Sequence, residues 1–90
     1  MLRTFSKLYA MAGLRLGWAY APSHVINALQ VVKQPFGANR VAVEAAIAAL
    51  DDHDFIAKSV EHNTVWQPWT ATELEKLGLT CLPSVTNFLM

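Results

Sequence analysis

Apolar residues occur in short runs separated by polar or small-residue breaks, and these runs predict the first elements of the chain. Residues 2–6 are interpreted as a short buried strand, and the run 16–21 (LGWAYA) is aromatic and continuous, which is also typical of a buried strand. The small residues at 12–14 between them predict a turn. Two later apolar runs, 79–82 and 86–90, predict two further short strands separated by Pro83 and Ser84.

Helical spacing begins after Pro22 and Ser23, where Ser23 is a candidate N-cap. Apolar residues then recur at helical spacing up to Val32, and the loop 33–38 follows with Pro35 and Gly37. Asn39 is the candidate N-cap of a second helix over 40–50. That helix is apolar on almost every side, which is typical of a buried helix, yet so short a chain offers little to bury it.

The acidic run 51–54 ends the second helix and can cap a third one, which is expected from about Phe55 to Leu77. Gly78 follows as a suitable C′ residue. Pro68 lies inside this helix and lacks a backbone donor, so we expect a kink or a split there. The order strand, strand, three helices, strand, strand predicts an α/β fold. A last strand that runs to the final residue leads us to expect a fragment rather than a closed domain.

Composition narrows the possible functions. The 90 residues carry seven basic and seven acidic side chains, so no charge excess favours nucleic acid as a partner. A hydrophobic content of 53% excludes intrinsic disorder. No apolar run approaches the roughly 20 residues that span a membrane, and no signal peptide is visible. With Cys81 as the single cysteine, no disulfide framework is expected, and a cytoplasmic location is the default expectation.

The residues 3–17, RTFSKLYAMAGLRLG, carry the candidate chemistry. A lysine at a strand end in apolar surroundings, such as Lys7, can become a nucleophile that bonds to an aldehyde. Arg15 offers a planar fork for phosphate, and Thr4 and Ser6 offer hydroxyl donors. An aldehyde and a phosphate on one ligand describe pyridoxal phosphate.

The motif S-K-x-x-x-x-A-G-L-R-x-G, which runs from Ser6 to Gly17, resembles the cofactor-lysine signature of fold-type I, class I/II aminotransferases. The fuller text RTFSK with AGLRLGW is most similar to the histidinol-phosphate aminotransferases. The later stretches fit that family too, from APSHVINALQVVKQPFGAN through the alanine-rich helix to ELEKLGL and the TNF segment. The resemblance therefore covers the whole chain.

The resemblance implies that Lys7 binds pyridoxal 5'-phosphate covalently and transfers a proton at the substrate α-carbon. It implies that Arg15 and Ser6 hold the cofactor phosphate, with Thr4 as a further donor. The partners it implies are an amino-group donor, a 2-oxo acid acceptor and a second copy of the full-length family member. It also implies that residues 1–50 end the large cofactor-binding domain, and that residues 51–90 form a linking helix and the start of the small C-terminal domain.

Three alternatives remain open at this point. The chain could be part of a related decarboxylase that acts on a phosphorylated amino acid, or part of an aromatic aminotransferase. It could instead be a catalytically inactive fragment that docks through its apolar helix 40–50. The three histidines lack metal-ligand spacing, so no metal site is expected. For Asn39 we favour the helix cap over a role at a dimer interface.

Overall fold

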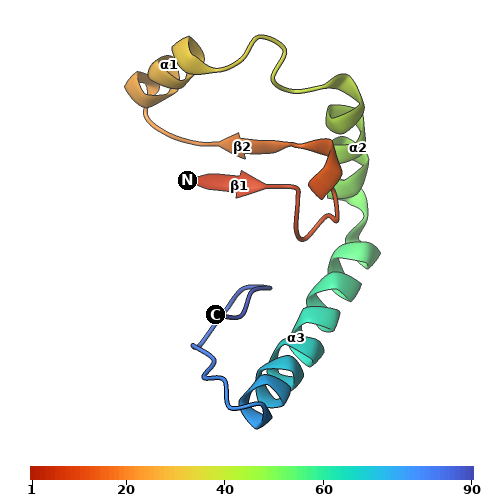
Figure 1. Ribbon diagram of the computed structural model, residues 1–90. Coiled ribbons are helices and arrows are strands. Elements are labelled where there is room, and N and C mark those ends of the chain that lie inside the picture. Colours follow the sequence, from red (N-terminus) through yellow and green to blue (C-terminus); the bar gives the residue numbers. More distant parts are fainter. The chain divides into compact units, whose positions relative to one another are not determined.

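The computed structural model describes residues 1–90 and combines three α-helices with one two-stranded sheet (Figure 1). In chain order the elements are β1 (Leu2–Thr4), the 3₁₀ helix η1 (Ala12–Leu14), β2 (Gly17–Ala19), α1 (Ser23–Val32), α2 (Arg40–Asp51) and α3 (His53–Lys76). Helices with a small sheet agree with the predicted α/β class. The chain divides into two compact units, Met1–Asp52 and His53–Met90.

The strands β1 and β2 form an antiparallel hairpin in the first unit, and Figure 1 shows them side by side. The register pairs Leu2 with Ala19, Arg3 with Trp18 and Thr4 with Gly17. Backbone bonds continue the pairing at both ends: the Phe5 N–H donates to the Leu16 carbonyl at 3.1 Å, and the Tyr20 N–H donates to the Met1 carbonyl at 2.8 Å. The two predicted strands and the turn between them are therefore confirmed.

The prediction that these two strands are buried is wrong. All six strand residues are exposed. A two-stranded hairpin has two faces, and in this chain no further strand or packed layer covers either of them. The strands are also shorter than the predicted segments 2–6 and 16–21.

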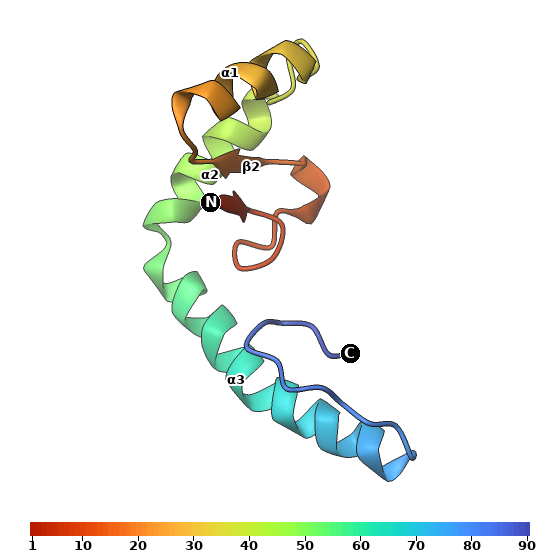
Figure 2. The same ribbon diagram turned by 90° about the vertical axis from the view of Figure 1, so that its left-hand side faces the viewer.

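The core of the first unit lies where the hairpin loop meets α2. Phe5, Met11 and Ala46 are buried to exposed fractions of 6%, 8% and 5%. The partly buried side chains around them belong to the same loop and helix: Tyr9, Leu14, Leu16, Ala45 and Ala49. Figures 1 and 2 both show α2 alongside the hairpin. Alanines on one face of α2 thus let the helix approach the loop closely.

The first helix, α1, begins at Ser23, but Ser23 does not cap it. The N-cap position is Pro22, whose carbonyl accepts from the Val25 and Ile26 N–H groups, and no side chain caps the helix. The predicted serine cap is therefore wrong, since Ser23 already has its place inside the first turn. At the other end Lys33 is extended, two residues before Pro35, which cannot continue a helix.

The second helix, α2, has the predicted cap and the predicted exposure. The Asn39 side chain accepts from the Ala42 N–H at 2.8 Å. Ala42 is fully buried, whereas Val41 and Ile47 are 70% and 57% exposed. The helix buries its alanine face and leaves its larger apolar side chains uncovered.

The third helix, α3, forms most of the second unit and runs without interruption through Pro68, so the predicted split is wrong. Proline costs the helix one N–H donor at that point, and the long regular stretches on either side keep the helix continuous. The predicted C′ glycine is confirmed: Gly78 has φ +81°. Its N–H donates to Glu75 and the Leu79 N–H donates to Leu74, which together form a Schellman motif.

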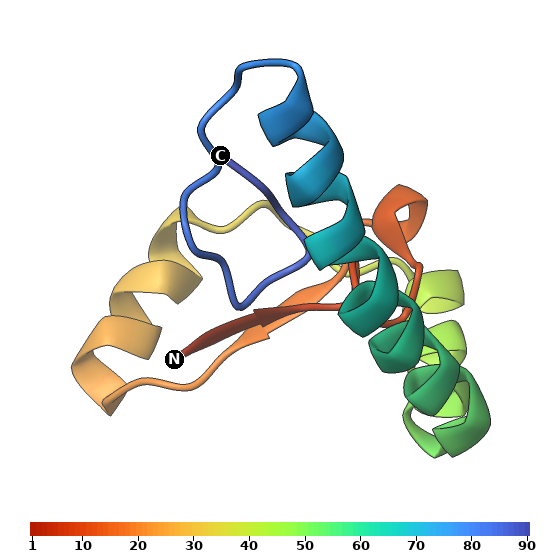
Figure 3. The ribbon, with the colours of Figure 1, turned by 90° about the horizontal axis from the view of Figure 1, so that it is seen from below.

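After α3 the chain returns along the helix, as Figure 3 shows, and it forms no strand. The strands predicted at 79–82 and 86–90 are therefore wrong. Strands need a partner, and the bond from the Leu82 N–H to the Met90 carbonyl at 2.7 Å does not extend into a paired ladder. Local bonds compete instead, because the Ser84 and Thr86 hydroxyls accept from the N–H groups of Thr86 and Phe88.

Side chains of α3 hold this returning segment. The Gln67 amide donates to the Thr86 carbonyl at 2.6 Å and to the Ser84 carbonyl at 3.2 Å. Asn63, one helical turn earlier, donates to the same Thr86 carbonyl at 3.4 Å.

None of the three helices has both the length and the apolar character that crossing a membrane requires.

Candidate functional site

Three predicted site residues, Ser6, Lys7 and Arg15, lie on the loop that joins β1 to β2, and the fourth, Thr4, is the last residue of β1. Two backbone bonds of 3.1 Å close this loop: Phe5 N–H donates to the Leu16 carbonyl, and Met11 N–H donates to the Phe5 carbonyl. Ser6 follows Phe5 and Arg15 precedes Leu16, so these bonds bring Ser6 and Arg15 to the same end of the hairpin. The buried side chains of Phe5 and Met11 anchor the loop to the core.

Thr4 and Ser6 form a pair of hydroxyls. The Thr4 hydroxyl donates to the Ser6 Oγ at 2.9 Å and accepts from the Ser6 N–H at 3.0 Å. A side-chain oxygen that bonds to the backbone two residues on fixes a tight local turn. The two hydroxyls predicted to act together are therefore adjacent in the structure.

Arg15 has an unusual backbone conformation. Its φ and ψ are both 54°, in the left-handed region that costs an L-residue about 1–2 kcal/mol. Its guanidinium donates from Nη1 to the Ala12 carbonyl at 2.6 Å, which leaves its other N–H groups for further partners. Ala10 and Phe36 share this left-handed conformation, with φ of 53° and 59°.

Lys7 lies in a bend after β1, within a turn that the Ala10 N–H closes on the Lys7 carbonyl at 2.9 Å. Ala10 has φ 53°, so this turn is strained as well. Lys7 is exposed, so the apolar surroundings expected around it are not supplied by the chain itself. Nearby, the Tyr9 ring packs on the Phe5 ring with centroids 5.0 Å apart, which gives Tyr9 a packing role.

The donor set of the loop fits the groups of pyridoxal phosphate. Hydroxyls and a guanidinium are donors that a phosphate dianion accepts from, and a primary amine bonds to an aldehyde. The distribution of charge also suits an anionic phosphate, although the net charge of the whole chain is zero. The segment 1–43 has no acidic residue and carries five basic ones: Arg3, Lys7, Arg15, Lys33 and Arg40.

Asn39 contributes a contact that the sequence did not reveal. Besides capping α2, its Nδ2 donates to the Leu14 carbonyl at 3.0 Å, across 25 positions of sequence. The asparagine at the start of an alanine-rich helix signals the cap alone, because the second partner depends on how the hairpin folds against α2. The contact links the helix to the turn that ends at Arg15.

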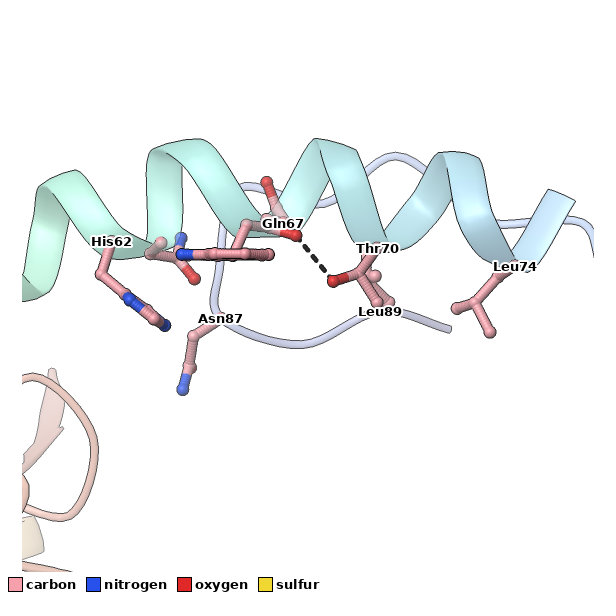
Figure 4. A pocket seen from close by; sticks show the side chains of 8 residues that line it. His62, Gln67, Thr70, Leu74, Asn87 and Leu89 are labelled. Carbon is pink, nitrogen blue, oxygen red and sulfur yellow. Dashed lines mark hydrogen bonds between the residues drawn. The ribbon is translucent and has the colours of Figure 1, made fainter. Parts of the chain in front are cut away.

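The second unit contains a pocket of about 440 Å³ between α3 and the returning segment, and none of the predicted site residues lines it (Figure 4). Its polar lining comes from His62, Asn63, Gln67, Thr70 and Asn87, and its apolar lining from Trp66, Leu74 and Leu89. The Thr70 hydroxyl is bonded to the Trp66 carbonyl at 2.7 Å. No three His, Cys, Asp or Glu side chains anywhere in the chain lie close enough to hold a metal ion.

The family model for class I and II aminotransferases matches residues 1–90 of the chain. The chain belongs to this family. Its members are generally pyridoxal-phosphate-dependent, and the loop with Lys7 and Arg15 lies inside the matched region. The family therefore agrees with the resemblance carried by the Ser6–Gly17 motif, while the roles of the individual residues remain predictions.

Curated relatives of the chain are named histidinol-phosphate aminotransferases. Those of Paramagnetospirillum magneticum and Maricaulis maris are each 47% identical over 88 residues, which is 98% of this chain and 24% of the relative. That of Ruegeria pomeroyi is 42% identical over 90 residues, which is 100% of this chain and 25% of the relative. The chain thus spans about a quarter of the length of these relatives. No solved structure matches it.

Proposed function

We propose that the chain forms the cofactor-anchoring part of a pyridoxal-phosphate-dependent aminotransferase. The observation that carries this proposal is the arrangement around the hairpin loop. The Thr4–Ser6 hydroxyl pair stands where the loop with Lys7 begins, and the strained Arg15 stands near its end. When bound, pyridoxal 5'-phosphate supplies an electron sink for the carbanion that forms at the substrate α-carbon.

The site residues have two roles, which are phosphate binding and covalent attachment of the cofactor. Thr4, Ser6 and Arg15 hold the phosphate, Arg15 through charged hydrogen bonds that lysine cannot reproduce in the same geometry. Lys7 would anchor the cofactor through its Nζ, and the same amine, once released from the cofactor, would move a proton from the substrate α-carbon to the cofactor carbon that carried the aldehyde. A fixed phosphate orients the rest of the cofactor toward Lys7.

For the substrates we propose histidinol phosphate and 2-oxoglutarate, with imidazole-acetol phosphate as the keto partner of the first. The names of the relatives support this choice within histidine biosynthesis. We further propose that residues 1–50 end the large cofactor-binding domain and that residues 51–90 supply the linking helix and the start of the small domain. A cytoplasmic homodimer completes the proposal.

A chimera tests this function directly. Residues 1–90 replace the matching segment of the Paramagnetospirillum magneticum relative, which supplies the remaining three quarters of the relatives' length. We expect the chimera to transfer the amino group of histidinol phosphate to 2-oxoglutarate. Lys7→Ala should abolish turnover, whereas Lys33→Ala, in the loop after α1, should leave it within about twofold, as for a surface change.

Borohydride reduction then identifies the lysine. Reduction of the cofactor-loaded chimera fixes the covalent link, and peptide mapping should find the label on Lys7. A label on Lys33, Lys58 or Lys76 would show that the anchor has been assigned to the wrong residue. A folded chimera that neither binds the cofactor nor turns over would show that this chain cannot replace its counterpart.

A catalytically inactive docking piece is the second candidate, and the exposed face of α2 favours it. Val43, Ile47 and Leu50 are 38%, 57% and 48% exposed along one side of that helix. Such a piece would support no turnover in the chimera, even with every loop residue intact. Turnover that depends on Lys7 decides between the two candidates.

A further inference from the structure

We infer that Asn39 is a positioning residue for the phosphate site and acts through Arg15. This inference rests on the phosphate role proposed for Arg15. Asn39 lies 24 positions after Arg15 and at the start of a different element, so nothing in the loop motif includes it. Its two side-chain hydrogen bonds connect that element to the strained turn.

The Asn39 amide uses both of its ends. Its Oδ1 accepts from the Ala42 N–H at 2.8 Å, and its Nδ2 donates to the Leu14 carbonyl at 3.0 Å. The two bonds together fix which way the amide faces, because its oxygen and nitrogen cannot exchange places without losing both. The side chain is therefore a short rigid link between α2 and η1.

The Leu14 carbonyl belongs to the peptide unit that joins Leu14 to Arg15. A peptide unit is planar, so fixing the direction of its oxygen also fixes the plane from which the Arg15 φ is measured. That φ is 54°, a conformation that an L-residue leaves readily unless its surroundings hold it. The bond from Asn39 acts directly on this peptide plane.

The other end of the link is anchored in the core. Ala42 is fully buried and Ala46 is 5% exposed, so the first turns of α2 cannot shift without opening the packing against the loop. The guanidinium itself is held from the other side by the Ala12 carbonyl at 2.6 Å. Arg15 is thus fixed at its backbone by Asn39 and at its side chain by η1.

Two variants separate the cap from the link. Asn39→Ser keeps a good N-cap oxygen for the Ala42 N–H but removes the amide donor to Leu14. Asn39→Ala removes both. If Asn39 only caps α2, Asn39→Ser should behave like the unchanged protein and Asn39→Ala should simply unfold more easily.

The first readout is the preference for phosphate, measured in the chimera as the ratio of its affinities for pyridoxal phosphate and for pyridoxal. We expect Asn39→Ser to lower this ratio by about three- to tenfold, the range for loss of one hydrogen bond. A purely structural role would weaken both ligands together and leave the ratio unchanged. In the Arg15→Lys background, Asn39→Ser should lower the ratio little further, because its effect passes through Arg15.

The second readout needs no cofactor and uses the apo chimera. The Leu14 N–H bonds to the Met11 carbonyl at 3.1 Å, and the Val43 N–H bonds to the Asn39 carbonyl at 3.2 Å. In Asn39→Ser, hydrogen exchange should speed up by about tenfold at Leu14 and stay unchanged at Val43. In Asn39→Ala it should speed up at both, because the cap is lost as well.

The outcomes distinguish this inference from the function on which it rests. If Arg15→Lys leaves the phosphate preference unchanged, the proposed role of Arg15 is wrong and the inference falls with it. If Arg15→Lys lowers the preference while Asn39→Ser does not, only the positioning role of Asn39 is overturned. Equal exchange at Leu14 in the Asn39→Ser chimera and in the unchanged chimera would also overturn it.

Discussion

The backbone carbonyl of Arg3 lies where a side chain on Gly17 would begin. A Cβ built on Gly17 would be 2.7 Å from that oxygen, closer than real Cβ contacts, and 3.5 Å from the Cα of Thr4. The conflict is with backbone atoms of the paired strand, which cannot move aside as a flexible side chain could. Glycine at this position therefore permits the pairing of β1 with β2 immediately after Arg15.

We predict that Gly17→Ala destabilises the chimera by about 1–3 kcal/mol, the usual cost of forcing an extra group into packed structure. Denaturant unfolding measures the loss. Gly13→Ala is the matched control, because a Cβ there meets nothing within 4 Å and should change stability by less than about 0.5 kcal/mol. Equal effects at the two glycines would show that the close approach to Arg3 carries no cost.

Replacing Arg15 should have opposite effects on protein stability and on the affinity for pyridoxal phosphate. Arg15→Gly removes the left-handed strain at φ 54°, so the apo chimera should be unchanged or up to about 1 kcal/mol more stable. The same variant should bind pyridoxal phosphate about ten- to a hundredfold more weakly, the cost of a lost charged hydrogen bond. Thermal unfolding and cofactor titration measure the two effects.

Arg15→Lys completes the comparison, because it keeps both the charge and the strain and loses only the planar fork. It should therefore bind the cofactor more weakly than the unchanged chimera and unfold at a similar temperature. An unchanged dissociation constant in both variants would remove Arg15 from the phosphate site.

The C-terminal end of α3 offers a purely conformational test. Gly78 has φ +81°, and a Cβ there would meet no atom within 4 Å. Gly78→Ala should therefore cost about 1–2 kcal/mol in the chimera through backbone strain alone, and Gly78→Asn should cost less, because asparagine tolerates this conformation. Denaturant unfolding ranks the three residues. A larger loss for asparagine than for alanine would contradict the assignment of the strain to φ.

Local signals in the sequence predicted the elements whose stability is local. Asn39 and Gly78 mark helix ends because capping depends on the side chain or backbone freedom of one residue, and both are confirmed. The hairpin was predicted for a similar reason, since two apolar runs flank a short turn. The same kind of signal failed at Ser23, because Pro22 occupies the N-cap position of α1.

The predictions that were wrong or incomplete depended on pairing or packing partners elsewhere in the chain. The runs at 79–82 and 86–90 have the composition of strands, but a strand exists only beside another strand, and none is available in the second unit. In the same way, the residues of β1 and β2 have the composition of buried strands and are exposed. The second bond of Asn39 was missed because its partner, Leu14, is 25 positions away.

In the candidate site, too, the features set by local sequence were predicted and those set by distant partners were not. The motif from Ser6 to Gly17 placed Lys7 and Arg15 in one loop, and the structure shows the Thr4–Ser6 hydroxyl pair where β1 enters that loop. No motif predicts the left-handed backbone of Arg15, because the bonds around it, including the one from Asn39 to the Leu14 carbonyl, depend on the folded loop. The sequence also did not predict that Lys7 is exposed, because exposure depends on which other segments of the chain pack over the side chain.

The exposed side of α2 leads to the last prediction, which concerns the 90-residue chain by itself. Val43, Ile47 and Leu50 follow one another at i, i+4 and i+7, so they form one apolar stripe on the helix, and each is at least 38% exposed. Contiguous apolar surface of this kind drives association in water. We expect the chain to associate at micromolar concentration and to unfold without a sharp cooperative transition.

A substitution on the stripe tests the cause of this association. Ile47→Lys places a charge in the middle of the stripe and should weaken association by at least about tenfold, the value of one buried aliphatic side chain. Val85→Lys is the control, because Val85 is fully exposed, lies in the segment after α3 and belongs to no stripe. Size-exclusion chromatography with light scattering measures the mass of each variant across a concentration series. A monodisperse monomer in the unchanged chain would contradict the prediction, and equal effects of the two lysines would mean that overall charge, rather than the α2 stripe, controls association.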